Sequence, residues 1–329
     1  MARVFSLIAT LGPGLNYDIQ PPVGQDWEVN DLGSSIWVGV PTASVPQMQV
    51  GLYNGVLGPS YFRNSTLVNP HIHGWVSPSR WMINNANYLR ITNPGAAPEN
   101  ISASVVLAQD QGPNRLSRVI SGIANLIPTA TVVIQPPVGQ DWVIYDVGSS
   151  LYVGAQPNGL PNVQVAMTDG TITADVAHGA DFRGWRPMEI YINNAVYLQL
   201  TNQAGFAADI SWSGAICQNQ GPNIPSQVVS AIATVGIGGV LTIQPPVGEE
   251  WRVTEIATST WTAGAPAALP DVAVNLTDGT IASLVQAGTD TKGWLAVIRY
   301  DLTNTLYMTL TDTSGAGGNI AVSAIRWRA

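Results

Sequence analysis

Charged side chains are scarce in this chain. Only 10% of its 329 residues are Asp, Glu, Lys or Arg, and Lys292 is the single lysine. Nucleic-acid binding depends on clustered Lys and Arg that neutralise phosphates, whereas the net charge here is −8 and no basic run occurs. The composition therefore argues against a nucleic-acid partner. So little charge also suggests that other subunits cover part of the surface, although Asn, Gln, Ser and Thr supply polar cover.

Cysteine and long apolar runs are also nearly missing. Cys217 is the only cysteine, so no intrachain disulfide can form, which fits assembly in a reducing compartment. Because it stands in an apolar run, we expect it to be a small buried side chain. No stretch is long and apolar enough to cross a membrane as a helix, and we expect no membrane partner.

Turn-forming and aromatic residues are abundant instead. The chain has 33 Gly, 23 Pro and 11 Trp, with a mean hydropathy of +0.15. Disordered chains are rich in charge and poor in aromatics, so this chain should fold. Short apolar segments lie between Gly- and Pro-rich turns, and no segment shows a sustained helical period. This pattern predicts an all-β fold of sandwiches or barrels.

One pattern occurs three times along the chain. It starts with a Gln-Pro-Pro-Val-Gly turn at 20–24, 135–139 and 244–248, and a Trp follows after two polar residues. A Gly-Trp pair, a tight turn and a Tyr that closes an Asn-containing run recur further on. The repeated anchors are Trp27, Trp142, Trp251, Trp75, Trp185, Trp294, Tyr88, Tyr197 and Tyr307. Self-similarity at a fixed period indicates repeated structural units.

Matching connectors divide the chain into three modules. A Gln-x-Gln-Gly-Pro-Asn segment occurs at 109–114 and again at 218–223. We therefore predict modules at 1–110, 111–219 and 220–329. The short connectors contain a stiffening Pro, so the modules should lie in a defined relation to each other. The segment 4–10 aligns with 119–125 and 228–234, which predicts a first strand rather than a cleaved leader.

Each module should contain roughly eight short strands. In module two, period-two alternation and an Asp169-Gly170 turn predict a hairpin after a strand at 163–167. Two apolar runs on either side of Asn193-Asn194 are expected to pair with each other. The expected strands of module two lie at 132–134, 142–147, 163–167, 190–192, 196–200 and 210–216. The predicted fold is all-β, with three tandem β-sandwich modules of jelly-roll-like form.

The repeated aromatic anchors allow two interpretations. A Trp at a fixed place in each copy could be a platform for a ligand such as a sugar ring. We favour the interpretation that Trp27, Trp142 and Trp251 cap the cores, because a buried Trp hides about 150–250 Å². The Asn and Tyr runs are interpreted as turn chemistry.

No set of residues for chemistry recurs in the three copies. His71-x-His73 would place two imidazoles on one face of a strand, but modules two and three have no such pair. The acids beside the repeated Trp residues, and those in the tight turns, are expected to be solvated loop carboxylates; they are Asp26, Asp141, Glu250, Asp169 and Asp278. No nucleophile elbow, phosphate loop or dinucleotide fingerprint occurs. We therefore predict no catalytic residue, no cofactor, no metal site and no enzymatic activity.

The repeated motifs resemble β-sandwich proteins of tailed-bacteriophage virions. The matching features are the Gln-Pro-Pro-Val-Gly-x-x-Trp turn, an Asp-Gly hairpin, a Gly-Trp pair and an Asn-x-x-Tyr-Leu-x-Leu-Thr-Asn strand and turn, from which module three departs at 306–308. The pattern is similar to that of capsid decoration (cement) proteins. This resemblance implies a location on the outer capsid surface and a major capsid protein, or another virion protein, as partner. It assigns no binding residue.

Three functions remain open at this point. The first is a capsid-decorating protein, in which three fused copies fill a threefold lattice site as a monomer with pseudo-threefold symmetry. The second is a tail, fibre or spike protein that binds a host receptor or glycan. The third, ranked last, is a hydrolase of surface polysaccharide. Copy number per particle separates the first two, since decoration proteins occur in hundreds of copies and tail fibres in a few.

Overall fold

The computed structural model describes most of the β structure of the chain. The described residues are 4–34, 49–56, 62–63, 75–76, 80–93, 98–110, 118–149, 163–177, 185–203, 205–219, 226–259, 272–286, 299–313 and 317–328. All their regular elements are strands, and all the strand pairs are antiparallel.

Module one folds into two sheets. The first has the order β1-β9-β3-β6, with β7 also paired to β3, and the second has the order β2-β8-β4-β5. The strands are β1 (Val4–Leu11), β2 (Asn16–Ile19), β3 (Gln25–Ser34), β4 (Gln49–Tyr53), β5 (Phe62–Arg63), β6 (Trp75–Val76), β7 (Trp81–Ile83), β8 (Tyr88–Thr92) and β9 (Glu99–Asp110). The expected first strand is therefore present as β1, and it pairs with β9 along its whole length.

Module two repeats this plan. Its sheets have the orders β10-β17-β12-β15 and β11-β16-β13-β14. The strands are β10 (Gly122–Leu126), β11 (Thr131–Ile134), β12 (Gln140–Ser149), β13 (Val163–Thr168), β14 (Thr173–Ala177), β15 (Trp185–Ile192), β16 (Tyr197–Asn202) and β17 (Ala208–Asn219). The predicted hairpin is confirmed as the β13–β14 pair, and Gly170 has a positive φ of 90° in its turn.

Module three has the same two layers. One is β18-β25-β20 with β23 paired to β20, and the other is β19-β24-β21-β22. The strands are β18 (Ala231–Val235), β19 (Val240–Ile243), β20 (Glu250–Ser259), β21 (Val272–Thr277), β22 (Ala282–Gln286), β23 (Tyr300–Leu302), β24 (Tyr307–Asp312) and β25 (Gly318–Arg328). A single bridge between Asp175 of β14 and Thr258 of β20 links its first sheet to module two. Three tandem β-sandwich modules, as predicted, make up the described chain.

Each sandwich has its own apolar core between its two sheets. Alternating residues of facing strands fill it, such as Leu32 and Leu52 in module one, Ile144 and Leu198 in module two, and Leu310 in module three. These side chains are almost fully buried. Period-two alternation thus places one face of strands such as β16 and β24 inside. The module boundaries stay a prediction, although β9 and β17 end at the predicted positions, Asp110 and Asn219.

The expected strand pair around Asn193-Asn194 is wrong. The strand before this turn, β15, pairs with β12, whereas the strand after it, β16, pairs with β11 and β13 in the opposite sheet. The Asn193 side chain accepts the N–H groups of Ala195 and Val196, and Asn194 donates to the carbonyl of Pro136. The Asn-rich turn is therefore a corner that carries the chain from one sheet to the other.

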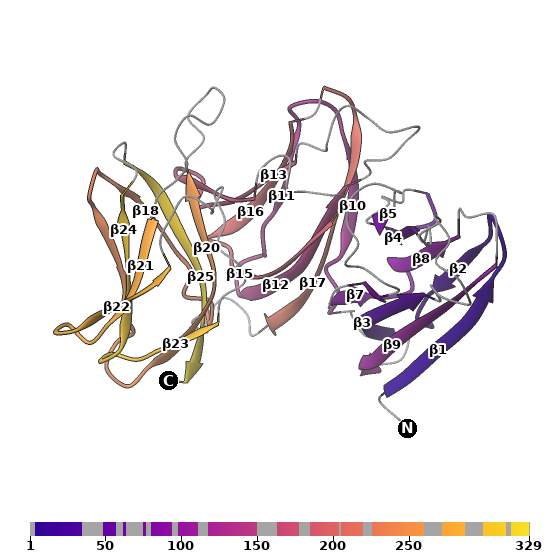
Figure 1. Ribbon diagram of the computed structural model, residues 1–329, viewed down its shortest axis with the longest axis horizontal. Coiled ribbons are helices and arrows are strands. Elements are labelled where there is room, and N and C mark those ends of the chain that lie inside the picture. The colour runs from indigo at the N-terminus through magenta and orange to yellow at the C-terminus, as the bar shows by residue number, and fades with distance from the viewer. Residues whose placement is uncertain are drawn as a thin grey trace, which may run out of the picture.

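The three modules lie in a row (Figure 1). Module two stands between the others, and the strand contacts of the described residues join module one to module two and module two to module three. A pseudo-threefold ring would also bring module three against module one. The expected threefold arrangement is therefore not the one that the structure shows.

Candidate functional site: a repeated inter-module interface

Hydrogen bonds between side chains and main chain join the modules to one another. At the boundary of modules one and two, the edge residue Met82 of β7 is bonded through both of its main-chain groups. Its N–H donates to Ser213 Oγ at 2.7 Å, and its carbonyl accepts the hydroxyl of Ser121 at 2.6 Å. Met82, Ser121 and Ser213 are all buried. Two serines of module two thus satisfy the main-chain groups of an edge residue of module one, on the side of β7 where no described strand pairs with it.

The same contact is made one module later. Tyr191 of β15 occupies the position of Met82, since each lies opposite the residue that follows the repeated Trp. Its N–H donates to Ser323 Oγ at 2.8 Å, and its carbonyl accepts the hydroxyl of Ser230 at 2.9 Å. The two module boundaries are therefore built by one interface used twice.

A buried carboxylate also repeats at the two boundaries. Asp26 Oδ2 accepts the N–H of Arg118 at 2.8 Å, and Asp141 Oδ2 accepts the N–H of Gln227 at 2.7 Å. Asp141 Oδ1 additionally accepts the hydroxyl of Ser226 at 2.7 Å. The exposed fractions of Asp26 and Asp141 are 3% and 2%. The expectation that these acids are solvated loop groups is therefore wrong, because the first residues of the next module bind them.

A β-bulge separates each of these acids from the Trp that follows it. The register of β3 against β9 shifts between Asp26 and Trp27, and that of β12 against β17 shifts between Asp141 and Trp142. A bulge re-aims neighbouring side chains. The Trp then packs on the core of its own module, while the acid reaches the next module.

Apolar side chains complete each boundary. Ile123 of β10 packs against the core of module one. Ile232 of β18 packs in the same way against the core of module two, which also includes Ala257 and Ala321 of module three. The outer face of each following sheet thus closes the open edge of the sandwich before it. Burial of apolar area is the main favourable contribution to such contacts.

Ion pairs border these contacts. Arg80 bonds Glu28 at 2.8 Å, and its guanidinium lies 4.4 Å from the ring centroid of Tyr145 in module two. Burial raises the pKa of the Tyr145 hydroxyl to about 12. At the second boundary, Arg299 pairs with Glu189 at 2.5 Å. The Arg299–Glu189 pair and the contact of Arg80 with Tyr145 therefore add charged groups to the links between modules.

A groove of about 270 Å³ lies between modules one and two. Its lining includes Asp26, Glu28, Tyr145 and Cys217. Cys217 is half-buried rather than fully buried as expected, because it faces this groove at the module boundary. The two carboxylates of the groove already accept protein hydrogen-bond donors, so it forms part of the interface.

The repeated Trp anchors are half-buried and lie against the cores. Trp27, Trp142 and Trp251 each pack on the core cluster of their own module. Each indole N–H donates to a side chain two residues earlier, at 2.9, 2.9 and 2.7 Å respectively. Trp75 and Trp185 begin strands β6 and β15, and Trp294 lies outside the described residues.

The Tyr anchors lie at the strand starts that follow the corner turns. Tyr88 is buried and meets the Tyr53 ring edge-on at 5.6 Å between centroids. Tyr197 and Tyr307 are half-buried at the starts of β16 and β24. The turn acids Asp169 and Asp278 each accept two backbone N–H groups within their own hairpin turns.

The structure does not place the His71-x-His73 pair that was considered above as metal ligands. His71, His73 and His178 lie outside the described residues. In the part of the chain that the structure describes, no three His, Cys, Asp or Glu side chains gather as a metal site would need. The same residues include no helix long and apolar enough to cross a membrane.

The interface serines were missed when the sequence was considered alone. A signal for them was present, because Ser6, Ser121 and Ser230 occupy one position of the aligned opening segments. Ser104, Ser213 and Ser323 are matched in the closing strands. Serine at the same strand position in all three copies indicates a contact that the alternation of apolar and polar residues does not explain.

The fold and the interface define the chain as a tandem β-sandwich protein whose modules are joined by one repeated contact. No family model and no curated protein matches it. One solved structure that aligns with it is described in the words "The Triple Jelly Roll Fold and Turret Assembly in an Archaeal Virus". The alignment covers 96% of this chain and 82% of that chain, at 10% identity and a TM-score of 0.26. A likeness at this TM-score supports no argument, and the fold stated above follows from the sheets of the chain itself.

Proposed function

We propose that this chain is a structural protein of a virion, which decorates and stabilises a capsid by binding the major capsid protein lattice. The observation that carries the proposal is the repeated interface. Two serines, one carboxylate and an apolar face fix each module against the one before it. A chain built in this way presents three similar sandwiches at a fixed spacing, as a repeating lattice requires.

The resemblance of the repeated motifs to decoration proteins supports the capsid location. The low content of charged residues supports wide contacts that depend on polar and apolar groups. In this proposal the chain acts on the outer capsid surface after assembly in the host cytoplasm, and it is not an enzyme. A row of modules would span neighbouring capsomers rather than fill one threefold site.

A spike or fibre protein is the second candidate. The row of modules favours it, because an elongated chain can carry a receptor-binding surface away from the particle (Figure 1). In that case the loops at one end of the row would bind a host receptor or a glycan.

Copy number in purified particles tests the proposal. Quantitative mass spectrometry of the virions should find hundreds of copies of this chain for each particle. A few copies would favour the spike or fibre, and absence from washed particles would contradict both. Release of the chain by mild treatment that leaves the capsid shell intact is expected for an outer-surface location.

A further inference from the structure

Module one carries the same outer sheet face as the other modules, but nothing in the described chain covers it. In modules two and three, this face closes the open edge of the preceding sandwich. Ser211 and Ala321 on that face have exposed fractions of 0%. Their counterpart in module one, Ser102, is exposed.

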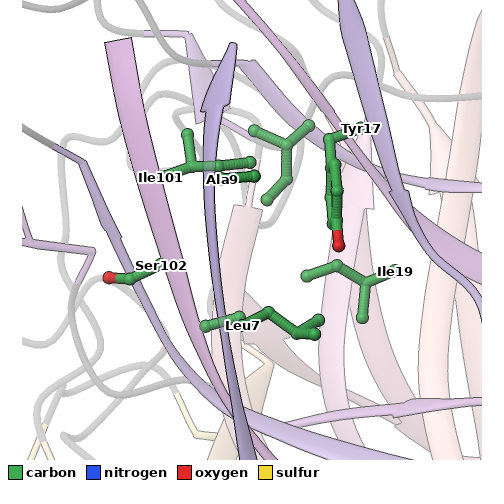
Figure 2. A pocket seen from close by; sticks show the side chains of 8 residues that line it. Leu7, Ala9, Tyr17, Ile19, Ile101 and Ser102 are labelled. Carbon is green, nitrogen blue, oxygen red and sulfur yellow. The ribbon is translucent and has the colours of Figure 1, made fainter.

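An isoleucine at the centre of this face shows the difference most clearly. Ile123 and Ile232 are partly buried against the preceding cores, whereas Ile8 at the same position of β1 is 80% exposed. Its neighbours Leu7 and Ala9 point into a small pocket between the two sheets of module one (Figure 2). Side chains alternate along a strand, so Ile8 points outward. Ile8 therefore lacks the favourable burial of apolar area that Ile123 and Ile232 gain against the preceding module.

Module three has the complementary open edge at the other end of the row. In module two, Val196 at this edge is 8% exposed, whereas Leu306 at the same position of module three is 44% exposed. In module one, the residue at this position, Asn87, donates to the carbonyl of Ser121 at 2.9 Å. The position therefore contacts the following module in module one, and it is buried at the same edge of module two.

The main-chain part of the contact is also kept in module three. Asp301 lies opposite Arg252, as Met82 and Tyr191 lie opposite the equivalent residues of β3 and β12. The serines bond only the N–H and the carbonyl at this position, so the change of side chain removes neither group. Glu250 stands where Asp26 and Asp141 stand, so the carboxylate is kept as well.

We propose that copies of this chain associate head to tail, with the β1-β9-β3 face of one copy closing the open edge of module three in the next. The occupant is a second copy because the interface continues one that the chain already uses twice. Such a contact joins two different surfaces, and it forms rings if the rotation closes and filaments if it does not. This inference does not depend on the virion assignment.

Paired variants of the full chain test this inference. The wild-type chain should show concentration-dependent association in sedimentation velocity. Ile8→Asp removes one end of the contact and Leu306→Asp removes the other, so each variant alone should sediment as a monomer. An equimolar mixture of the two should form a dimer and nothing larger, because each pair then has one intact contact.

Ile127→Asp is the matched control. Ile127 is also exposed, at 65%, but it lies in the turn between β10 and β11, away from both ends. This variant should associate as the wild type does, and all variants should keep the circular dichroism spectrum of the wild type. A wild-type chain that stays monomeric up to its solubility limit would overturn the inference. The inference would also be overturned if Ile8→Asp associated on its own, or if the equimolar mixture of Ile8→Asp and Leu306→Asp stayed monomeric.

Discussion

Each internal interface is held at the residue scale by serine side chains that bond both main-chain polar groups of one edge residue. Ser213→Ala leaves the Met82 N–H buried without its acceptor, which costs about 1–3 kcal/mol. We expect urea unfolding of the full chain to show a loss of this size. The matched control is Ser104→Ala, at the same position of the uncovered face of module one, which should change stability by less than about 0.5 kcal/mol. Equal losses in the two variants would contradict the role given to the interface serines.

The hairpin-turn acids give a pH dependence at the same scale. Hydrogen bonds from the N–H groups of Ile172 and Thr171 hold the pKa of the Asp169 carboxyl below its ordinary value. These hydrogen bonds favour the ionised carboxylate, so they stabilise the fold fully above a pH of about 3.9, the ordinary pKa of Asp. This stabilisation is lost as the pH falls through the lower pKa that the carboxyl has in the folded protein. Carboxyl NMR titration should therefore find a lowered pKa. Asp169→Asn should keep the turn without the pH dependence, because Asn54 already accepts the N–H of Val56 in module one.

An ordinary pKa for Asp169 in that titration would contradict the turn geometry. Asp278 offers an internal comparison, because the N–H groups of Ile281 and Thr280 lower its pKa in the same way. Both carboxyls should shift together in the wild type, and only the signal of Asp278 should remain in Asp169→Asn.

At the scale of elements, one strand pair has exchanged large and small residues between modules. Leu7 faces Ala103 in module one, whereas Gly122 faces Trp212 in module two. A Cβ on Gly122 would lie 2.4 Å from Trp212 Cζ2, so Gly122→Leu should destabilise by about 1–3 kcal/mol. Combining it with Trp212→Ala recreates the pair of module one and should recover part of the summed loss. Urea unfolding of the two single variants and the double variant measures this coupling.

Strictly additive losses in that cycle would contradict the packing account. Trp212→Ala also removes the indole N–H that donates to the Ile120 carbonyl at 2.9 Å. Recovery should therefore stay incomplete, because this hydrogen bond has no replacement in the double variant.

The elements were largely predictable from the sequence, and their partners were not. Period-two alternation and the Asp169-Gly170 turn predicted β13 and β14 because both signals are local. The turn at Asn193-Asn194 looked like a hairpin, yet it links two sheets. Its Asn194 side chain bonds Pro136 in a distant turn, and the local sequence does not reveal this contact. The burial of Asp26 was missed for the same reason, because its partner, Arg118, lies 92 residues away. Contacts across long separations leave no pattern in one chain unless a repeat shows them.

At the scale of the whole molecule, using one interface twice places the modules in a row. Repetition of one contact with no closure produces an open array, whereas the threefold fusion expected from the copy number would need a third contact, between modules one and three. The contacts at Met82 and Tyr191 hold neighbouring modules together in this row. We expect these two contacts to keep the modules from moving independently in solution.

Small-angle X-ray scattering of the dilute, monomeric chain tests this arrangement most directly. The account predicts an asymmetric distance distribution with a long tail, fitted by the three modules in the row of Figure 1 as one rigid body. The Ser213→Ala, Ser323→Ala double variant should broaden this distribution, because it loosens both boundaries. A compact, symmetric distribution would mean that the modules close on each other as a threefold ring. A wild-type curve that only a flexible ensemble fits would contradict the rigid interface.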